Sequence, residues 1–455
     1  MSEYLDFGVP GLILMSLLGV LVARAALTTA RTPQGAVGWV VFLVSFPLVA
    51  IPSYAVFGGM VRLNRSAKAP RTHGEATPGH GRLARLAAVA GVPVTGGNAA
   101  RLLIDGRATF DAVFEAIDAA EEEVLVQFYI IRSDALGQAL RDRLVAAAGR
   151  GVRVAVLCDV VGSLFLGRRY VRELRAAGCE IRGIPGPHRT LMRIGVNFRN
   201  HRKAVVVDGR VGFTGGINAG QEYLDGGRHF SAWRDTFVRI EGPMVGQLRD
   251  LFAADWLAIT GETLAAPPAQ PPSEANGTAG MVVGFGPTDA LEKGSLLLCG
   301  LIGLAERRLW LTTPYLVPHA DLLTALQLAA LRGVDVRVIV PKALDHYLPW
   351  YASRDYFDPL MRAGATIHEY RDGFMHQKVI LVDDDVASVG SVNLDMRSLL
   401  LNFELTALFE DERFAGEVER MLLADLGRST LAPARAPDWK VRLIAPAARL
   451  FAPLL

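Results

Sequence analysis

Residues 201–208 read His-Arg-Lys-Ala-Val-Val-Val-Asp, and residues 376–383 read His-Gln-Lys-Val-Ile-Leu-Val-Asp. In both stretches a histidine and a lysine two positions apart begin an apolar run, so side-chain alternation along a strand puts both on one face. Each stretch ends at an aspartate, Asp208 or Asp383, where we expect the chain to reverse in a hairpin. The repeat therefore predicts two copies of one structural unit.

A segment of small residues follows each hairpin at the same offset. It ends at Asn218 in the first copy, as Gly-Gly-Ile-Asn, and at Asn393 in the second, as Gly-Ser-Val-Asn. Small residues let a ligand approach the backbone closely, and the asparagine amide is a hydrogen-bond donor. A lone histidine and lysine are more often surface residues than catalysts, but the repeated spacing favours two half-sites, each with a histidine, a cation and an amide donor.

The similarity between the two halves extends upstream of the motif. Residues 124–130 and 151–156 are strand-like runs on either side of a helix-like stretch, and residues 309–315 and 333–338 repeat this arrangement. Alternating strands and helices are typical of α/β units with a largely buried sheet. Two such units facing each other across a pseudo-twofold axis would bring the half-sites together in one cleft.

The duplicated His-x-Lys-x4-Asp motif resembles that of the phospholipase D superfamily, and the wider match resembles the bacterial cardiolipin synthases over nearly the whole chain. The stretches that carry the resemblance are Asn197–Lys203, Gly215–Asn218, Trp233–Asp235, Asp255–Trp256, Tyr351–Arg354, His376–Lys378, Asn393–Ser398 and Leu401–Glu404. The resemblance implies a phosphatidyltransferase that converts two phosphatidylglycerol molecules to cardiolipin and glycerol, with no metal ion and no cofactor.

Displacement at a phosphodiester needs a nucleophile, a proton donor and charge neutralisation, because the alkoxide is a poor leaving group. One histidine is expected to form a phosphohistidine while the other transfers protons. Asp208 and Asp383 are expected to organise the loops of the two motifs. The expected catalytic set is His201, Lys203, Asp208, His376, Lys378 and Asp383, with Asn218 and Asn393 binding the phosphate.

A nucleophilic imidazole needs its second nitrogen held in one tautomer, usually by a carboxylate or a carbonyl. Glu404 follows His376, and Asp235 occupies the corresponding position after His201. The resemblance assigns this orienting role to both acids, and surface ion pairs with neighbouring arginines are the alternative. The residues leave open which histidine is the nucleophile, because the two halves are chemically alike; the resemblance favours His201.

Two apolar runs, Phe7–Ala23 and Ala36–Gly59, precede the repeated part of the chain. Their lengths fit membrane-spanning helices, and the acidic Glu3 and Asp6 argue against a cleaved signal peptide. Basic residues are more numerous after the second run than between the runs, which predicts a cytoplasmic enzyme. The expected architecture is α/β: two similar phospholipase D-like units with a shared active-site cleft, preceded by two transmembrane helices in the bacterial inner membrane.

Composition divides the chain into five parts. Residues 1–62 are the expected two-helix membrane anchor, and residues 63–82 a flexible tether rich in small and polar residues. The first phospholipase D-like domain is expected at 83–264, followed by a Pro- and Ala-rich linker at 265–280. The second domain is expected at 281–455, and its apolar end with spaced arginines predicts a segment near the membrane surface.

A formal net charge of only +2 does not favour a nucleic-acid-binding protein. The expected partners are therefore phosphatidylglycerol and cardiolipin in the bilayer, and no nucleic acid. Three other functions stay open: a membrane-tethered hydrolase that uses water as acceptor, a nuclease of the same superfamily, and a non-catalytic scaffold. Association into a homo-oligomer is also left open.

Overall fold

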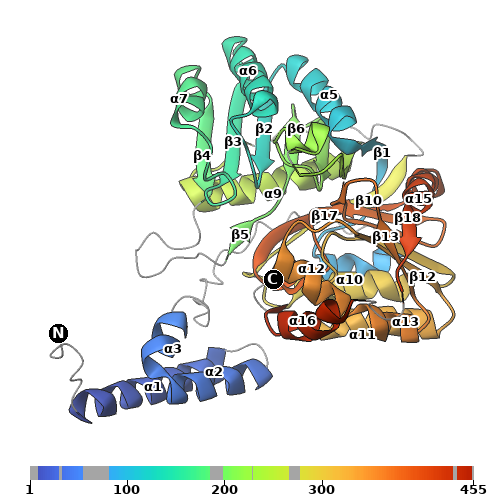
Figure 1. Cartoon of the computed structure of the whole chain (residues 1–455). Helices are drawn as coiled ribbons and strands as arrows, with labels where there is room; N and C mark the ends of the chain where they lie inside the picture. Colours follow the sequence, from blue (N-terminus) through green and yellow to red (C-terminus); the bar gives the residue numbers. More distant parts are fainter. Residues whose placement is uncertain are drawn as a thin grey trace. The chain divides into compact units, whose positions relative to one another are not determined.

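The computed structural model describes residues 9–29, 33–54, 81–184, 198–227, 229–265, 277–433 and 438–452. The chain divides into two units, one of Met1–Ala67 with Pro185–Phe198 and the other of Lys68–Ile184 with Arg199–Leu455. The second unit contains both copies of the repeated motif and one large mixed sheet (Figure 1). All of the expected site residues therefore belong to one unit.

Each repeat contributes one half of the mixed sheet, and the strand order is the same in both halves except for one additional strand, β18, at the outer edge of the second. From the centre outward the first half contains β1 (Thr95–Ile104), β9 (Thr236–Glu241), β7 (Val211–Gly215), β6 (Ala204–Val207), β2 (Glu123–Phe128), β3 (Arg153–Asp159) and β4 (Glu180–Ile184). The second half contains β10 (Thr278–Phe285), β17 (Asn402–Glu410), β16 (Val386–Gly390), β15 (Val379–Val382), β11 (Arg308–Thr312), β12 (Asp335–Pro341), β13 (Thr366–Tyr370) and β18 (Ser429–Leu431). The predicted duplication is confirmed, with β1 and β10 pairing antiparallel where the halves meet.

The pairing within each half follows from the sequence pattern. β6 and β7, and likewise β15 and β16, form the hairpins expected after each motif. β2, β3 and β4 are parallel, as are β11, β12 and β13. Parallel neighbours need helical crossovers, which the predicted helix-like stretches supply. Every residue of β2 is buried, because helices cover both faces of the sheet.

Helices with clear start signals connect and cover the strands. The carboxylate of Asp134 accepts a hydrogen bond from Gly137 N (3.0 Å) and caps α6, while Asp411 caps α15 through Phe414 N (2.7 Å). The helices of the first half are α5 (Asp105–Asp118), α6 (Ala135–Gly149), α7 (Arg168–Ala176), α8 (Glu222–Asp225) and α9 (Pro243–Thr260). Those of the second half are α10 (Lys293–Leu304), α11 (Ala320–Leu331), α12 (Tyr347–Arg354), α13 (Phe357–Arg362), α14 (Met396–Leu400), α15 (Glu412–Gly427) and α16 (Trp439–Arg449). The short helices η2 (Leu83–Leu86) and α4 (Ala87–Ala90) precede β1.

Three cores of buried side chains hold the second unit together. α5, α6 and α7 pack on one face of the first half-sheet, and α10, α11 and α13 pack on the corresponding face of the second. The third core joins the halves, because side chains of α9, such as Trp256, and of α15, such as Phe414, belong to it together with residues of both half-sheets. This shared core fixes one half against the other, which a site built from both halves requires.

The first unit contains α1 (Val9–Thr29), α2 (Pro33–Ser45) and α3 (Pro47–Ser53). In the part of the chain that the structure describes, no helix has the length and hydropathy that a bilayer crossing demands, so the prediction of two transmembrane helices is not supported. The second apolar run is divided at Phe46, whose backbone (φ −137°, ψ 56°) is not helical, as expected before a proline. α2 is consequently 13 residues long. That length corresponds to about 20 Å, against about 30 Å of hydrocarbon core.

Other sequence predictions fall partly outside the described residues. α1 extends past the first apolar run to include Arg24, while residues 7, 8 and 55–59 of the two runs are not described. The same holds for 63–80 of the expected tether and 266–276 of the expected linker. The predicted cytoplasmic side depended on two spans and stays a prediction.

Candidate active site

His201 lies directly after the short strand β5 (Arg199–Asn200), which pairs with the other half of the chain. β5 runs parallel to the first two residues of β17. The amide of His201 continues this pairing by donating to the carbonyl of Phe403 (2.9 Å). Because the register advances one residue at a time, the next residue of β17, Glu404, comes to lie beside His201.

A parallel strand pairing of the same kind positions His376. The short strand β14 (Phe374–Met375) runs parallel to β8 (Trp233–Arg234) of the first half. The amide of His376 donates to the carbonyl of Arg234 (2.8 Å), so that Asp235 lies beside His376. Two matching parallel ladders therefore position the two histidines, and each ladder joins the two repeats.

Each histidine ring is hydrogen-bonded to the carboxylate of the opposite half. The Nδ1 atom of His201 lies 2.9 Å from Oε1 of Glu404, and Nδ1 of His376 lies 2.7 Å from Oδ2 of Asp235. Both acids are fully buried, which argues against the alternative of surface ion pairs. The sequence interpretation counted each acid from the histidine of its own half, whereas the structure exchanges the partners. Each ring is held with its Nε2 side directed away from the carboxylate.

The two motif lysines converge with the histidines in one buried cluster. Lys203 Nζ donates to the carbonyl of His201 (2.8 Å), and Lys378 Nζ donates to the carbonyl of His376. Burial lowers the pKa of Lys203 to about 7 and that of Lys378 to about 8, and the charge of Lys378 contributes to the first shift. Burial also lowers the pKa of His376 well below its usual value, with further contributions from both lysines and from His201. Two lysines and two carboxylates therefore form one buried electrostatic unit around the histidines, and the lysines are the groups that suit a phosphate.

The two asparagines lie at the ends of the motif hairpins but have different partners. Asn218 donates its amide to the hydroxyl of Tyr223 (2.6 Å), and its Oδ1 accepts from the amide of Ile130 (3.2 Å). Asn393 donates to Oδ2 of Asp395 (3.0 Å). The Oδ1 atom of Asn393 is buried without a hydrogen-bond partner in the described part of the chain. Phosphate binding by both amides stays a prediction.

The motif aspartates act on the backbone of the neighbouring strand. Asp208 accepts from the amides of Glu121, Glu122 and Glu123 at 2.8–3.0 Å, just where β2 begins. Asp383 accepts in the same way from three amides at the start of β11. Both aspartates have left-handed backbones, with φ of 51° and 50°. This geometry agrees with the loop-organising interpretation.

Replacing Asp208 by alanine is expected to destabilise the fold rather than the chemistry, because it leaves three strand-end amides without their acceptor. The expected loss is about 2–3 kcal/mol of unfolding free energy. Thermal unfolding followed together with activity per folded molecule tests this. Asp111→Ala, at an exposed position of α5, is the control and should change neither quantity. Loss of activity in a fully folded Asp208→Ala protein would contradict the structural role.

The two histidine–carboxylate pairs are not equivalent, and one substitution between the repeats contributes to the difference. Ser391 occupies the position of Gly216, and its hydroxyl donates to Oε2 of Glu404. Burial acts to raise the pKa of Glu404, but His201, Lys203 and Ser391 lower it below its usual value. Burial raises the pKa of Asp235 to about 6, and no side-chain hydroxyl can stand at Gly216, where a Cβ atom would lie 2.1 Å from Oδ1 of Asp235.

Ser391→Gly is therefore expected to move the acidic limb of the pH–activity profile to higher pH. The serine hydroxyl favours the ionised form of Glu404, so its removal lets the pKa of Glu404 rise and protonation begin at higher pH. The rate at neutral pH should fall about tenfold, since a hydrogen bond to a charged group is lost. The pH profile measured in both proteins tests this, and an unshifted acidic limb would show that the hydroxyl does not act on Glu404.

A second set of side chains supports the motif strands from behind, a role that was not predicted from the sequence. Arg202, between His201 and Lys203, binds Asp255 of α9 (2.8 Å). Its counterpart Gln377 binds Asp425 of α15 (2.8 Å), which also pairs with Arg234. The signal was available in the motif itself, because the residue between histidine and lysine must face the opposite side of the strand.

Aromatic rings line the histidines. The ring of Tyr129 lies edge-on to His201 with centroids 5.0 Å apart, and Trp233 lies 5.4 Å from His376. Tyr223, the partner of Asn218, also lies edge-on to His376 at 6.2 Å. These rings restrict both imidazoles to narrow orientations.

A family model described as cardiolipin synthase, phospholipase D-like domain, matches residues 113–256 and 298–426, which include both motifs and both orienting acids. The chain is also 42% identical over 444 residues to cardiolipin synthase A of Pseudomonas aeruginosa (strain LESB58), covering 92% of this chain and 90% of that protein. The chain belongs to the cardiolipin synthase family. Cardiolipin synthase A of Pseudomonas putida (strain W619) gives a similar match, 42% over 436 residues, covering 90% of each protein.

The fold of this family member is similar to that of a solved enzyme with distant sequence. The crystal structure of phosphatidylserine synthase from Haemophilus influenzae Rd KW20 superposes with a TM-score of 0.60 at 16% identity, covering 81% of this chain and 98% of that chain. At this identity the similarity shows the fold alone. It agrees with an α/β architecture of two phospholipase D-like units.

Proposed function

We propose that the chain catalyses phosphatidyl transfer between two phosphatidylglycerol molecules, giving cardiolipin and free glycerol. The single observation that carries this proposal is the crossed arrangement of two buried histidine–carboxylate pairs around two lysines, in a chain of the cardiolipin synthase family. One phosphodiester replaces another in this reaction, so the enzyme must supply positioning and a covalent relay rather than an energy source.

His201 is the proposed nucleophile. Its Nε2 attacks phosphorus of the donor lipid, the bond from phosphorus to the glycerol oxygen breaks, and His376 gives a proton to the departing alkoxide. Glycerol leaves, and a hydroxyl of the second phosphatidylglycerol loses its proton to His376 and attacks phosphorus. The bond between phosphorus and nitrogen then breaks and returns His201 to its starting state.

The difference between the two acids supports this assignment. Three hydrogen-bond partners besides the lysines keep Glu404 ionised. They are His201, Ser391 and Asn402. A permanent negative charge at Nδ1 stabilises the positive charge that a phosphohistidine places on the ring. Burial raises the pKa of Asp235 to about 6, so this carboxylate takes up a proton more readily than Glu404 does. It therefore suits the histidine that takes up and releases protons.

Lys203 and Lys378, with the amides of Asn218 and Asn393, are proposed to hold the non-bridging oxygens of the phosphate. Both lysines lie in the same cluster as the histidines, and the burial that lowers their pKa also strengthens their attraction to an anion.

The two catalytic domains are proposed to be residues 83–264 and 281–455. Residues 1–62, 63–82 and 265–280 are proposed to be the attached and connecting segments.

The test is product analysis with purified full-length protein and labelled phosphatidylglycerol in mixed micelles. Cardiolipin and glycerol are expected in equal amounts. Phosphatidic acid as the main product would overturn the proposal in favour of a hydrolase that uses the same histidines with water.

A further inference from the structure

An exposed apolar turn follows β3 at the edge of the first half. Four of the six residues at 160–165 are large apolar side chains that face solvent: Val160 (45% exposed), Val161 (47%), Leu164 (66%) and Phe165 (82%). Single exposed apolar residues are ordinary on protein surfaces, but a contiguous group of this size marks a contact site. We call these four residues the apolar tip.

The apolar tip is held in place by hydrogen bonds beneath it. Oδ1 of Asp159 accepts from the amides of Val161 and Gly162, both at 2.9 Å. The amide of Ser163 donates to the carbonyl of Asp159 (2.9 Å), and its hydroxyl donates to the carbonyl of Tyr129 (3.2 Å). These hydrogen bonds hold the polar groups of the turn toward the protein interior, and the four apolar side chains face solvent.

The same hydrogen bonds connect the apolar tip to the nucleophile. Tyr129, which anchors Ser163, lies edge-on to the ring of His201. The second oxygen of Asp159 accepts from the amide of Asn200 (3.0 Å), the residue before His201. Only one layer of residues separates the apolar tip from the reacting group.

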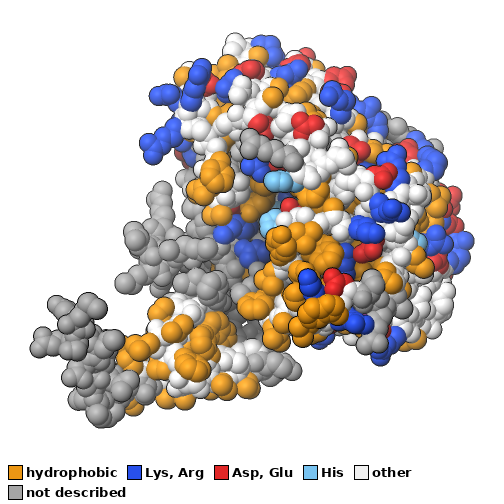
Figure 2. Space-filling model, viewed as in Figure 1, with side chains coloured by type: hydrophobic (Ala, Val, Ile, Leu, Met, Phe, Trp, Pro, Cys, Tyr) orange, Lys and Arg blue, Asp and Glu red, His pale blue; other side chains and the backbone are white. Residues whose placement is uncertain are grey.

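A basic helix begins directly after the turn. The exposed side chains of α7 include four arginines, Arg168, Arg169, Arg172 and Arg175. The helix contains one acidic residue, Glu173. A hollow of about 560 Å³ is lined by Arg168, Arg172 and Arg175 with Leu166, Val171 and Ala176. Figure 2 shows blue side chains gathered over the region of α7, and hydrophobic side chains nearer to pale-blue histidines.

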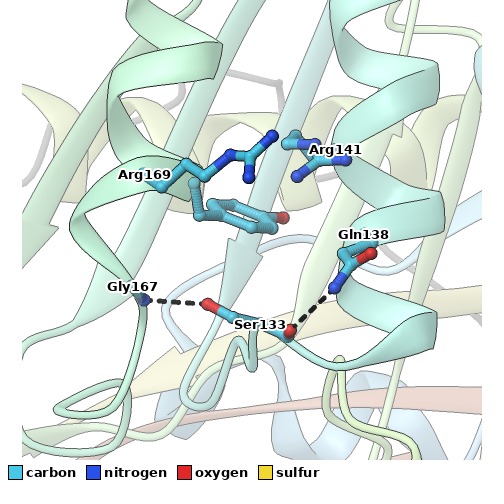
Figure 3. Close-up of a pocket in the computed structure, with 6 residues that line it drawn as sticks. Ser133, Gln138, Arg141, Gly167 and Arg169 are labelled. Atoms are coloured by element: carbon cyan, nitrogen blue, oxygen red, sulfur yellow. Dashed lines mark hydrogen bonds between the residues drawn. The ribbon is translucent and has the colours of Figure 1, made fainter.

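A second hollow lies between α6 and α7. Figure 3 shows Arg141 and Arg169 reaching toward each other above Ser133, whose hydroxyl accepts from the amide of Gly167 (2.8 Å). The arginines share Glu173, at 2.8 Å from Arg141 and 2.6 Å from Arg169. Apolar and basic surfaces are therefore adjacent along one continuous stretch of chain.

We propose that the apolar tip and the exposed arginines of α7 form a docking face for an anionic lipid bilayer. The apolar tip enters the interface while the arginines bind lipid phosphates, and together they bring the entrance of the active site to the lipid surface. A bilayer is favoured over a protein partner because an exposed aromatic and aliphatic turn beside a cluster of one charge sign is what an anionic interface attracts. The purpose assigned to this face rests on the proposed function, whose lipid substrates are themselves anionic.

The second half carries a smaller counterpart. α12 follows β12 as α7 follows β3, and its first residues, Tyr347 (73% exposed) and Leu348 (38%), are exposed apolar side chains. Asp345, two residues earlier, is close enough to act on the pKa of His376. Apolar groups thus accompany both half-sites.

The test uses the full-length protein with a polarity-sensitive fluorophore attached at residue 165 through Phe165→Cys, in a chain in which the partly exposed Cys299 is replaced by alanine. Cys158 and Cys179 are buried. Vesicles contain equal parts of phosphatidylglycerol and phosphatidylcholine with a quencher on the acyl chains. The matched control carries the fluorophore at Leu331→Cys on α11, where the native leucine is 69% exposed. Quenching at residue 165 is expected to exceed that at residue 331 at least about threefold.

The arginines are tested in the same assay. Arg172→Glu should reduce quenching at residue 165 at least about twofold, whereas Arg107→Glu, at an exposed position of α5, should not change it. Equal quenching at residues 165 and 331 would overturn the proposal. So would an environment at residue 165 that becomes less polar in the absence of lipid as the protein concentration rises, because that result would indicate contact with another protein molecule. Quenching does not require turnover, so this result is independent of whether cardiolipin is formed.

A kinetic comparison separates docking from chemistry. The double variant Leu164→Ser, Phe165→Ser is expected to lose at least about tenfold in rate on vesicles while keeping its rate on a monomeric short-chain phosphatidylglycerol. The control Leu328→Ser, Leu331→Ser changes two leucines of similar exposure on α11 and should keep both rates. Equal losses on both substrates would show that the turn serves the fold or the site, and would contradict a docking role.

Discussion

His201→Ala is expected to abolish cardiolipin formation, with a loss of at least about a thousandfold in rate. The imidazole is the proposed covalent carrier of the phosphatidyl group. Lys203 is tied to a backbone carbonyl and Tyr129 faces the ring edge-on, so neither is placed to replace it. His376→Ala should cause a loss of similar size, because both proton transfers pass through this residue. Initial rates in mixed micelles give both values.

His368→Ala provides the control for these two variants. His368 lies on β13 of the same sheet and is half-buried, but its ring contacts Thr366 rather than the motif lysines. Its replacement should leave the rate within about threefold of the parent. A His201→Ala or His376→Ala protein that folds normally and keeps a tenth of the activity would contradict the mechanism.

Glu404→Gln is expected to lower the rate by about a hundredfold to ten-thousandfold, as when the carboxylate that holds a catalytic histidine is neutralised. The crossed pairing makes a sharper prediction than the loss itself. Glu404 acts to raise the pKa of His201, so its neutralisation should lower the pKa of His201 further. Nitrogen NMR signals of isotope-labelled histidines report each ring separately.

Asp235→Asn is the reciprocal variant, and it should change the ring signals of His376 instead. If each acid served the histidine of its own half, Glu404→Gln would change His376 and Asp235→Asn would change His201. That reversed pattern would contradict the exchanged partners seen at 2.9 Å and 2.7 Å.

The fold of the catalytic unit could be predicted from local patterns because each determinant is local. Side-chain alternation at residues 201–207 and 376–382 specifies a strand with one functional face, and Asp208 and Asp383 specify the turns that follow. Because the motif is repeated, the structure predicted for the first half also applies to the second half. The predicted strands at 124–130 and 309–315 are found as β2 and β11, shortened at their carboxyl ends where the chain turns toward the site.

The exchange of acids could not be predicted, because it depends on pairing between segments that lie 203 residues apart for His201 and Glu404 and 141 apart for Asp235 and His376. Nothing near His201 indicates that Asn402 and Phe403 will run beside Arg199 and Asn200, since two-residue strands have no periodic signal. The effect of Ser391 follows from the same pairing: it distinguishes the half-sites only after Glu404 is known to belong to His201.

The predicted pair of transmembrane helices is not supported by the described residues. Hydropathy alone measures the length of an apolar run, and the run at Ala36–Gly59 is long enough. Pro47 ends the helix before it because the preceding Phe46 is not helical, and Pro47–Ser53 form a separate short helix, α3.

The most direct test of the central claim, a phosphatidyl group carried on His201, is to trap it. His376→Ala protein is mixed with acyl-labelled phosphatidylglycerol, denatured under alkaline conditions that preserve phosphohistidine, digested, and its labelled peptide sequenced by mass spectrometry. One labelled peptide, modified at His201, is expected from the His376→Ala protein, and none from His201→Ala protein. Label at any other residue, or from His201→Ala protein, would contradict that claim.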